Sequence, residues 1–316
     1  MKLTLKKSIL RALIFSTFCI LFFGCQKDDD DVPPPKPPVA NAGNDQTIQL
    51  PANSFTLTGS GTTENGSIKG YLWSLVSGPN VPVITKPSSA TTTVTGFIAG
   101  TYVFQFLVVD SAGLTGVDAV TILVNQAPIQ TLTLQPTNNN DERHILGNGT
   151  TIDLSDHATE LDAAAWTIGG EIIYVRGLFK FDLSSIPAGA TILSAKLSLY
   201  SNPTPLNGDL VHANSGTNNS MFIRRITSYW DPLLTSWSNQ PTATTTDQVS
   251  IPHTPLSFLD LTDVDVKNLV IAMKNTSNYG FMISLQNEVI YNIRDFCSST
   301  YPDATKHPKL VITYQP

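Results

Sequence analysis

The chain has 316 residues, of which 25 are acidic and 19 basic, and its formal net charge is −6. An acidic chain without a basic patch is a poor partner for nucleic acid, whose phosphates attract lysine and arginine. Cys297 is the only cysteine after residue 25, so that part of the chain cannot form an internal disulfide. The chain after residue 25 is long enough for two domains of ordinary size. Because no internal disulfide is available, apolar cores must stabilise them.

The first 31 residues have the layout of an export signal. Four basic residues are followed by an apolar run from Ala12 to Gly24, which is short for a transmembrane helix. Cys25 stands where cleavage is expected. This segment resembles a bacterial lipoprotein signal, in which residues 1–24 are removed and Cys25 is acylated. Four residues after the cysteine resemble the signal that Bacteroidetes-type bacteria use to display lipoproteins at the cell surface: Gln26, Lys27, Asp28 and Asp29.

These resemblances imply a protein held in the outer membrane by its N-terminal acyl chains and facing the cell exterior. Two or three acyl chains anchor a protein firmly, because each buried methylene contributes about 0.8 kcal/mol. A soluble exported protein with an ordinary signal peptide is the alternative. Residues 25–38 are expected to form an acidic and proline-rich tether, since proline favours a stiff, extended backbone.

Residues 39–125 alternate short β-rich runs with turn signals such as Asn65-Gly66 and Ala112-Gly113. In one run the large apolar side chains occupy alternate positions, which places them on one face of a strand: Tyr102, Phe104, Phe106 and Val108. Trp73 is the expected core partner of this row. The number and spacing of the runs predict a β-sandwich.

This segment resembles a PKD-type immunoglobulin-like domain. The resemblance is carried by residues Pro38–Thr47, Leu57–Gly61, Tyr71–Ser74, Gly100–Phe104 and Val109–Gly113. It implies that the domain is a spacer or an accessory module of a surface protein and that Trp73 has a structural role.

Residues 130–316 are expected to form a larger β-sandwich of the jelly-roll type, with about ten strands and one short helix. The helix is predicted from Thr262 or Asp263 to Met273, with Thr262 as its N-cap. Four apolar side chains at helical spacing form its predicted buried stripe: Val266, Leu269, Val270 and Met273. The fold class predicted for the whole chain is all-β.

The C-terminal unit resembles the DNRLRE-type domain, a β-sandwich family that includes carbohydrate-binding module family 96. The carrying residues are Arg176–Ile192, Ala195–Tyr200, Trp230, Thr235–Trp237, Gln240-Pro241, Leu261–Val264, Asn278–Phe281, Phe296–Ser299 and Pro308–Tyr314. The resemblance implies non-catalytic binding of an extracellular polysaccharide.

Sugar binding requires a flat aromatic ring for the apolar side of a pyranose, together with planar hydrogen-bonding groups around it. The candidate residues are Trp166, Tyr174, Arg176, Trp230 and Trp237. Arginine is included because its fork can clamp a carboxylate of an acidic polysaccharide, and Arg224, Arg225 and Arg294 share this chemistry. For each of these residues a packing or solvated role is the alternative.

No catalytic motif is present, and the five histidines lack metal-ligand spacing, so the chain is not expected to be an enzyme. No cofactor is expected, although closely spaced acids could hold a structural calcium ion, with Asp153 and Asp156 as weak candidates beside Glu160 and Asp162. The alternative function is a structural or adhesive surface protein that contacts other proteins and has no glycan ligand.

Overall fold

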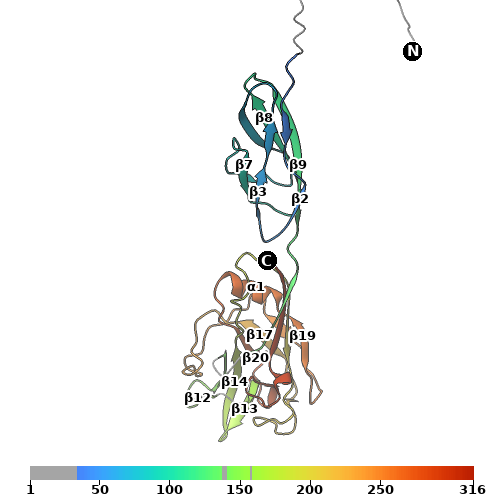
Figure 1. Ribbon diagram of the computed structural model, residues 1–316. Helices are drawn as coiled ribbons and strands as arrows, with labels where there is room; N and C mark the ends of the chain where they lie inside the picture. Colours follow the sequence, from blue (N-terminus) through green and yellow to red (C-terminus); the bar gives the residue numbers. More distant parts are fainter. Residues whose placement is uncertain (1–33, 137–140, 157–158) are drawn as a thin grey trace, which may run out of the picture.

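The computed structural model describes residues 34–136, 141–156 and 159–316 (Figure 1). Within these residues the regular structure is almost entirely β, with one α-helix and one short 3-10 helix. The strands form two units, one before and one after residues 126–129. The predicted all-β class is therefore confirmed. The proposed export signal with Cys25 lies outside the described residues.

The N-terminal unit contains nine strands. They are β1 (Val39–Asn41), β2 (Gln46–Gln49), β3 (Ser54–Thr58), β4 (Ser60–Thr62), β5 (Ile68–Ser77), β6 (Val83–Ile84), β7 (Thr91–Thr95), β8 (Gly100–Asp110) and β9 (Thr115–Asn125). One sheet has the order β2-β9-β8-β5 and a second has the order β3-β7-β6, while β1 pairs with β4. This is the immunoglobulin-like sandwich predicted for the segment.

The core of this unit is built on the alternating apolar side chains of β8. The rings of Tyr102, Phe104 and Phe106 are fully buried. Trp73 of β5 is also buried, and its ring centroid lies 4.5 Å from that of Phe106. Its indole Nε1 donates a hydrogen bond to the carbonyl oxygen of Ala90 at 3.2 Å. The predicted aromatic row and its tryptophan partner are confirmed.

Asp110 connects the two predicted turns of this unit. Its Oδ2 accepts a hydrogen bond from Asn65 Nδ2 at 2.9 Å, and its Oδ1 accepts one from the amide of Ala112 at 3.0 Å. These bonds, first of all the one from Asn65, hold the pKa of Asp110 below its ordinary value. Both turns place a glycine at positive φ, +99° at Gly66 and +80° at Gly113, a conformation that side chains with a Cβ rarely adopt.

The C-terminal unit contains the remaining strands and both helices. The elements are β10 (Gln130–Leu134), β11 (Glu142–Gly147), β12 (Asp153–Asp156), β13 (Glu160–Ile168), β14 (Glu171–Phe179), β15 (Thr191–Leu199), β16 (Asn214–Ser215), β17 (Met221–Arg225), β18 (Val249–Ile251), β19 (Leu261–Asp265), α1 (Lys267–Asn275), β20 (Phe281–Leu285), β21 (Asn292–Cys297), η2 (Ala304–Lys306) and β22 (Lys309–Gln315).

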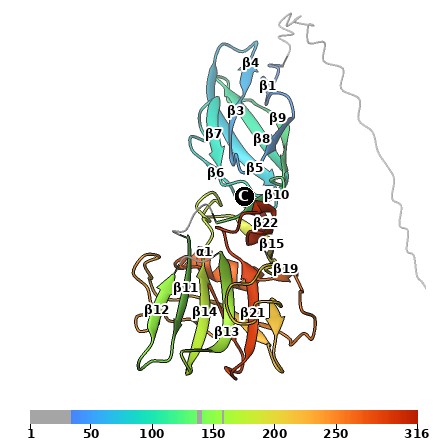
Figure 2. The ribbon, with the colours of Figure 1, turned by 90° about the horizontal axis from the view of Figure 1, so that it is seen from below.

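These strands form a smaller sheet of order β10-β22-β15-β19 and a larger one that runs from β16 through β21, β13, β14, β20 and β17 to β18, with β11 and β12 attached to β14. Figure 2 shows β12, β11, β14, β13 and β21 side by side. Apolar side chains from both sheets and from α1 form one core, including Phe179, Leu197, Phe281 and Leu310.

The helix begins later than its sequence pattern predicts. Residues 261–265 form β19, which pairs with β15, so Thr262 does not cap the helix. The N-cap residue is Val266, and no side chain caps it. The strand forms because pairing with β15 satisfies the hydrogen-bonding groups of its backbone. This gain outweighs the local helix signals. The buried stripe of the helix is as predicted, with Leu269, Val270 and Met273 inside.

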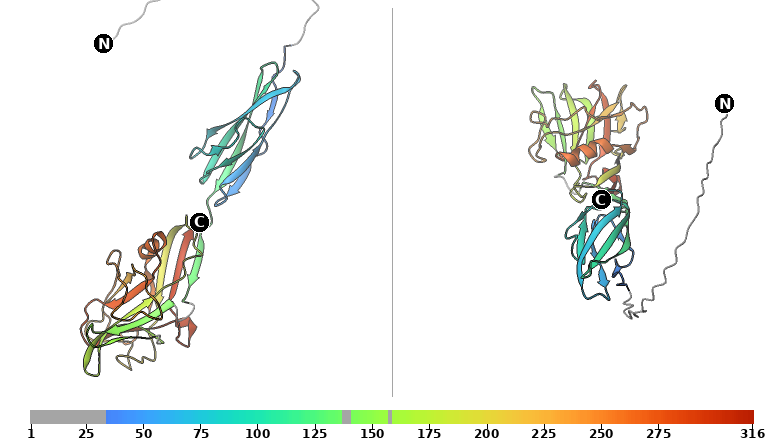
Figure 3. Two further views of the ribbon diagram at one scale, coloured as in Figure 1. Left: turned by 90° about the vertical axis from the view of Figure 1, so that its left-hand side faces the viewer. Right: turned by 90° about the horizontal axis from the view of Figure 1, so that it is seen from above.

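The two units are joined by residues 126–129, between the end of β9 and the start of β10 (Figure 3). Gln315, in the last strand, reaches the junction: its Nε2 donates to the carbonyl oxygen of Ala127 at 2.6 Å, and its Oε1 accepts from Gln126 Nε2 at 2.9 Å. No helix of the described residues is both long and apolar enough to cross a membrane.

Candidate functional site

Three of the predicted sugar-binding residues lie together in the C-terminal unit. Tyr174 and Arg176 are two positions apart on β14 and therefore point to the same side of the sheet. Trp237 comes from the long loop between β17 and β18, and its ring centroid lies 6.0 Å from that of Tyr174. The guanidinium carbon of Arg176 lies 4.5 Å from the centroid of the Trp237 ring. All three side chains are half-buried, and we call them the Trp237 cluster.

Polar neighbours fix Arg176 within this cluster. Its Nη2 lies 2.7 Å from Glu288 Oε1, and its Nη1 donates to Gln240 Oε1 at 2.7 Å. Gln240 in turn donates from Nε2 to the carbonyl oxygen of Trp237 at 3.0 Å. The arginine, the amide and the indole are thus held in one network. This pre-organised set of an aromatic ring, a planar cation and carboxamide groups is suited to a polar, ring-shaped ligand.

Arg224 of β17 adds a second cation near the cluster. Its guanidinium carbon lies 4.3 Å from the centroid of the Phe222 ring, and its Nε donates to Gln248 Oε1 at 2.8 Å. Burial, followed by the positive charge of Arg176, lowers the pKa of Arg224 from its ordinary value, while Glu288 opposes this change. Two arginines against the one carboxylate of Glu288 leave this region with a net positive charge, which attracts an anionic group.

The position of Trp237 depends on the loops around it. A Cβ atom on Gly147 would lie 2.5 Å from Trp237 Cγ, so only glycine allows the indole to pack against β11. Asp153 accepts hydrogen bonds from the amide and the hydroxyl of Ser238, at 3.0 and 2.5 Å, which lowers its pKa. A surface hollow of about 410 Å³ lies here, lined by Gly149, Thr150, Ile152, Asp153, Trp237 and Ser238.

Trp230 is a packing residue and lies apart from this surface. It is 4% exposed, and its Nε1 donates to the carbonyl oxygen of Tyr279 at 2.6 Å. Its ring packs among apolar residues of the sheet, including Ile145, Leu178 and Met282. This burial leaves no ring face for a sugar, so the structure does not support ligand contact by Trp230.

Trp166 lines a different pocket, of about 260 Å³, which extends along β13 from Asp162 to Ile168. Its ring meets the edge of Tyr291 at a centroid distance of 5.3 Å. Ile173 and Val175 also line this pocket, and they alternate along β14 with Tyr174 and Arg176. The pocket therefore opens on the opposite side of this part of the sheet from the Trp237 cluster.

The weak calcium candidates have other partners. Asp153 binds Ser238, as described above, and Asp156 Oδ1 lies 3.1 Å from His144 Nδ1. The other ring nitrogen of His144, Nε2, lies 3.1 Å from Asp162 Oδ2. Burial alone would lower the pKa of His144, but the charge of Asp162, followed by the contact with Asp156, outweighs it and raises the pKa to about 10.

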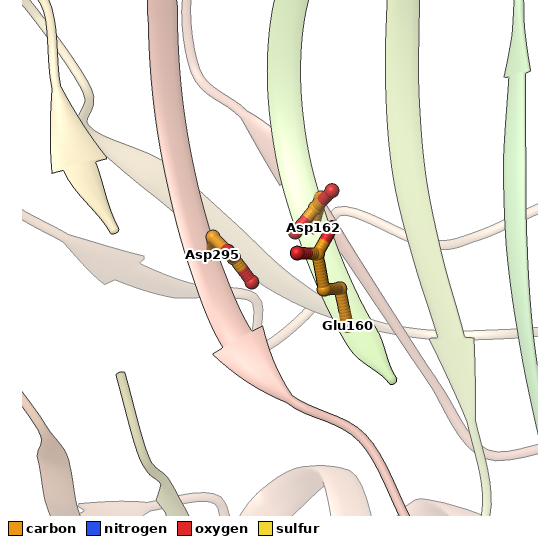
Figure 4. A group of neighbouring side chains, drawn as sticks. All are labelled: Glu160, Asp162 and Asp295. Atoms are coloured by element: carbon orange, nitrogen blue, oxygen red, sulfur yellow. The ribbon is translucent and has the colours of Figure 1, made fainter. Parts of the chain in front are cut away.

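Asp162 also belongs to a tight group of acids on the larger sheet (Figure 4). Glu160 and Asp162 of β13 and Asp295 of β21 each offer a carboxylate oxygen, and these oxygens lie within 4.8 Å of one another. All three residues are at most 1% exposed. Burial, then the charge of Asp162, raises the pKa of Asp295 to about 12 and that of Glu160 to about 7. We call these residues the buried acid group.

The sequence indicates only part of this group. Glu160 and Asp162 are noticeable as alternating acids at the start of an apolar strand, but Asp295 lies far along the chain. It joins them because β21 pairs with β13 in a register that places Asp295 directly opposite Asp162. The sequence of β21, Asn-Ile-Arg-Asp-Phe-Cys, mixes polar and apolar residues, so it gives no local signal that could have identified Asp295.

Comparisons with known proteins match each unit to a domain family. Residues 42–124 match the K319L-like PKD domain, and residues 173–314 match carbohydrate-binding module family 96. The chain thus carries a PKD domain followed by a module of this family, as the sequence motifs predict. Both are non-catalytic kinds of domain.

The similar proteins found cover parts of the chain. A dyslexia-associated protein KIAA0319-like protein of Mus musculus is 38% identical over 91 residues, which are 29% of this chain and 9% of that protein. The solution structure of the PKD domain from the KIAA 1837 protein is 37% identical, covers 27% of this chain and 84% of its own, and has a TM-score of 0.26. A structure of carbohydrate-binding modules from the β-sandwich superfamily is 12% identical, with coverages of 90% and 98% and a TM-score of 0.23.

Proposed function

We propose that this protein is a surface-exposed lipoprotein that binds extracellular polysaccharide without cleaving it. The C-terminal sandwich supplies the binding site, and the PKD domain is a spacer that holds this site away from the membrane. The observation that carries the proposal is the Trp237 cluster, in which a fixed arginine of β14 lies over the aromatic ring of a tryptophan from a distant loop. The family match of residues 173–314 supports carbohydrate as the ligand class.

The geometry of the cluster favours a polysaccharide that carries carboxylates. The Trp237 ring suits the apolar side of a pyranose, while Arg176 and Arg224 are placed to attract a negative charge. Glu288 forms an ion pair with Arg176 and partly neutralises its charge. Arg224 therefore supplies the second positive charge of the site. A neutral chain would use the aromatic surface alone and would bind more weakly.

The test is a binding survey with the chain from Cys25 onward, by glycan array and by migration in gels that contain neutral or acidic polysaccharides. We expect binding to an acidic glycan, and we expect Trp237→Ala to weaken it about 10-fold, the effect of losing about 1.4 kcal/mol of ring contact. Trp166→Ala is the matched control, because Trp166 lies on the other side of the sheet and should leave this binding unchanged.

Two results would contradict the binding proposal. The first is a failure to bind any glycan after a broad survey, which would favour a structural or adhesive protein that contacts other proteins. The second is equal loss of binding in both tryptophan variants. Release of reducing ends or unsaturated sugars from a bound polysaccharide would instead reveal an enzyme.

The membrane part of the proposal rests on residues 1–29. Acylation of Cys25 would anchor the protein in the outer membrane, and Gln26 to Asp29 would direct it to the outer face. Labelling with a fatty-acid probe should mark the wild-type chain and leave Cys25→Ala unmarked. Protease added to intact cells should digest the protein if it faces the exterior, and complete protection would argue against surface display.

A further inference from the structure

The buried acid group collects more acidic side chains in the interior than the cations described beside it could neutralise if all were ionised. Its three carboxylates lie together in the interior, and the nearest cation described is His144, which contacts Asp162 and is shared with Asp156. Arg294 precedes Asp295 in β21, but adjacent strand residues point to opposite sides of the sheet. Burying ionised carboxylates without a counter-ion costs several kcal/mol each.

Two oxygens of this group lack donors from outside it. Within the described part of the chain, Asp162 Oδ1 and Asp295 Oδ1 are buried and accept no hydrogen bond from a residue outside the acid group, although Asp162 and Asp295 contact each other. Figure 4 shows the carboxylates of Glu160, Asp162 and Asp295 directed toward one another. Acceptors without donors that converge on one point are the arrangement that a bound cation requires, and a packed hydrophobic core would not produce it.

Glu160 fixes the loop that covers this point. Its Oε1 accepts hydrogen bonds from the backbone amide of Leu206 and from Asn202 Nδ2, the second at 3.0 Å, and its Oε2 accepts one from Asn207 Nδ2 at 2.6 Å. Asn202 Nδ2 also donates to Asp295 Oδ2 at 3.1 Å. The loop is thereby held against the acids by the amide groups of its asparagines.

One residue of the group, Asp162, borders a pocket. Asp162 and His144 line the 260 Å³ pocket, together with Trp166 and Asn207. This pocket provides a path for an ion and room for the water molecules that would complete its coordination. It also brings a tryptophan into the neighbourhood of the acids, which gives an optical signal for a bound lanthanide.

We propose that Glu160, Asp162 and Asp295 bind a divalent cation, Ca²⁺, at the floor of this pocket. The ligand chemistry selects the ion. All three groups supply oxygen, which Ca²⁺ prefers, and Ca²⁺ accepts the irregular geometry of three carboxylates from two strands. Zinc prefers sites that include nitrogen or sulfur ligands, and both nitrogens of His144 already face Asp156 and Asp162. The ion would tie β13, β21 and the loop of residues 202–208 together.

The test uses the chain from Cys25 onward, first stripped of metal with a chelator. Scanning calorimetry with and without millimolar Ca²⁺ should show an increase of about 5 °C in the melting temperature of the C-terminal unit. Tb³⁺ should give luminescence on excitation of tryptophan, and Ca²⁺ should displace it. Asp295→Asn, which keeps the size of the side chain, should lose both effects, while Asp153→Asn should retain both.

The alternative is that the acids share protons and bind no ion. A wild-type chain whose melting temperature does not respond to Ca²⁺ and that gives no Tb³⁺ signal would overturn the proposal. An Asp295→Asn variant that keeps the full Ca²⁺ effect would do the same. Asp162→Asn provides a second test, because it removes a different ligand and should also abolish the Tb³⁺ signal. This test still applies if Asp295→Asn misfolds.

Discussion

Arg294 is a basic residue buried inside the larger sheet. Replacing it tests how much its burial costs in the free energy of folding. The side chain is fully buried, and none of its three guanidinium nitrogens has a hydrogen-bond partner among the described residues. Asn214 lies opposite it in the β16–β21 pairing, and the side-chain atoms Nδ2 and Oδ1 of Asn214 are likewise without partners among the described residues. We predict that Arg294→Met stabilises the protein.

The magnitude follows from the cost of the buried charge. Burial lowers the pKa of Arg294 from 12.5 to about 10. At about 1.4 kcal/mol per pKa unit, the folded state loses about 3 kcal/mol by keeping this arginine charged at neutral pH. Methionine keeps most of the apolar stem and removes the charge, although the smaller side chain gives up about 1 kcal/mol of packing. The net expectation is an increase of about 2 kcal/mol in the free energy of unfolding.

Urea denaturation at pH 7, followed by tryptophan fluorescence, measures this change, because three of the four tryptophans lie in the C-terminal unit. Arg225→Met is the matched control: Arg225 is a half-buried strand arginine, and its replacement should change the free energy of unfolding by less than about 0.5 kcal/mol. A loss of stability in Arg294→Met would refute the reasoning, since it would mean that the guanidinium has a stabilising partner such as an internal anion or ordered water.

Three further predictions concern other parts of the chain. Trp73→Ala should destabilise the PKD domain by about 3–5 kcal/mol in the same assay, because the indole packs on Phe106, and an unchanged transition would contradict its core role. Burial raises the pKa of Glu142 from 4.5 to about 7, so the unfolded chain ionises first as the pH rises. The free energy of unfolding should therefore fall by about 3 kcal/mol between pH 4.5 and 7, and Glu142→Gln should remove that part of the pH profile. Gly147→Ala should displace Trp237 and weaken glycan binding, and unchanged affinity would show that the indole is not fixed by this contact.

The sequence by itself determines the local features of this protein. Alternation of apolar residues predicts β8 with its buried aromatic row, and helical spacing predicts the buried stripe of α1, because these periods depend only on backbone geometry. The spacing of two between Tyr174 and Arg176 likewise places them on one side of a strand. Family motifs identify both units, since they retain residues that each fold requires at fixed positions.

The tertiary structure alone decides which distant residues meet. Trp230 and Trp237 belong to the same loop and look equivalent in sequence, yet one is buried in the sheet and the other packs against Arg176. Asp295 joins Asp162 only through the register of β13 and β21. The reason is physical: strand pairing and side-chain packing depend on the whole arrangement of the sheets, and a one-residue change of register would exchange the buried and exposed sides of a strand.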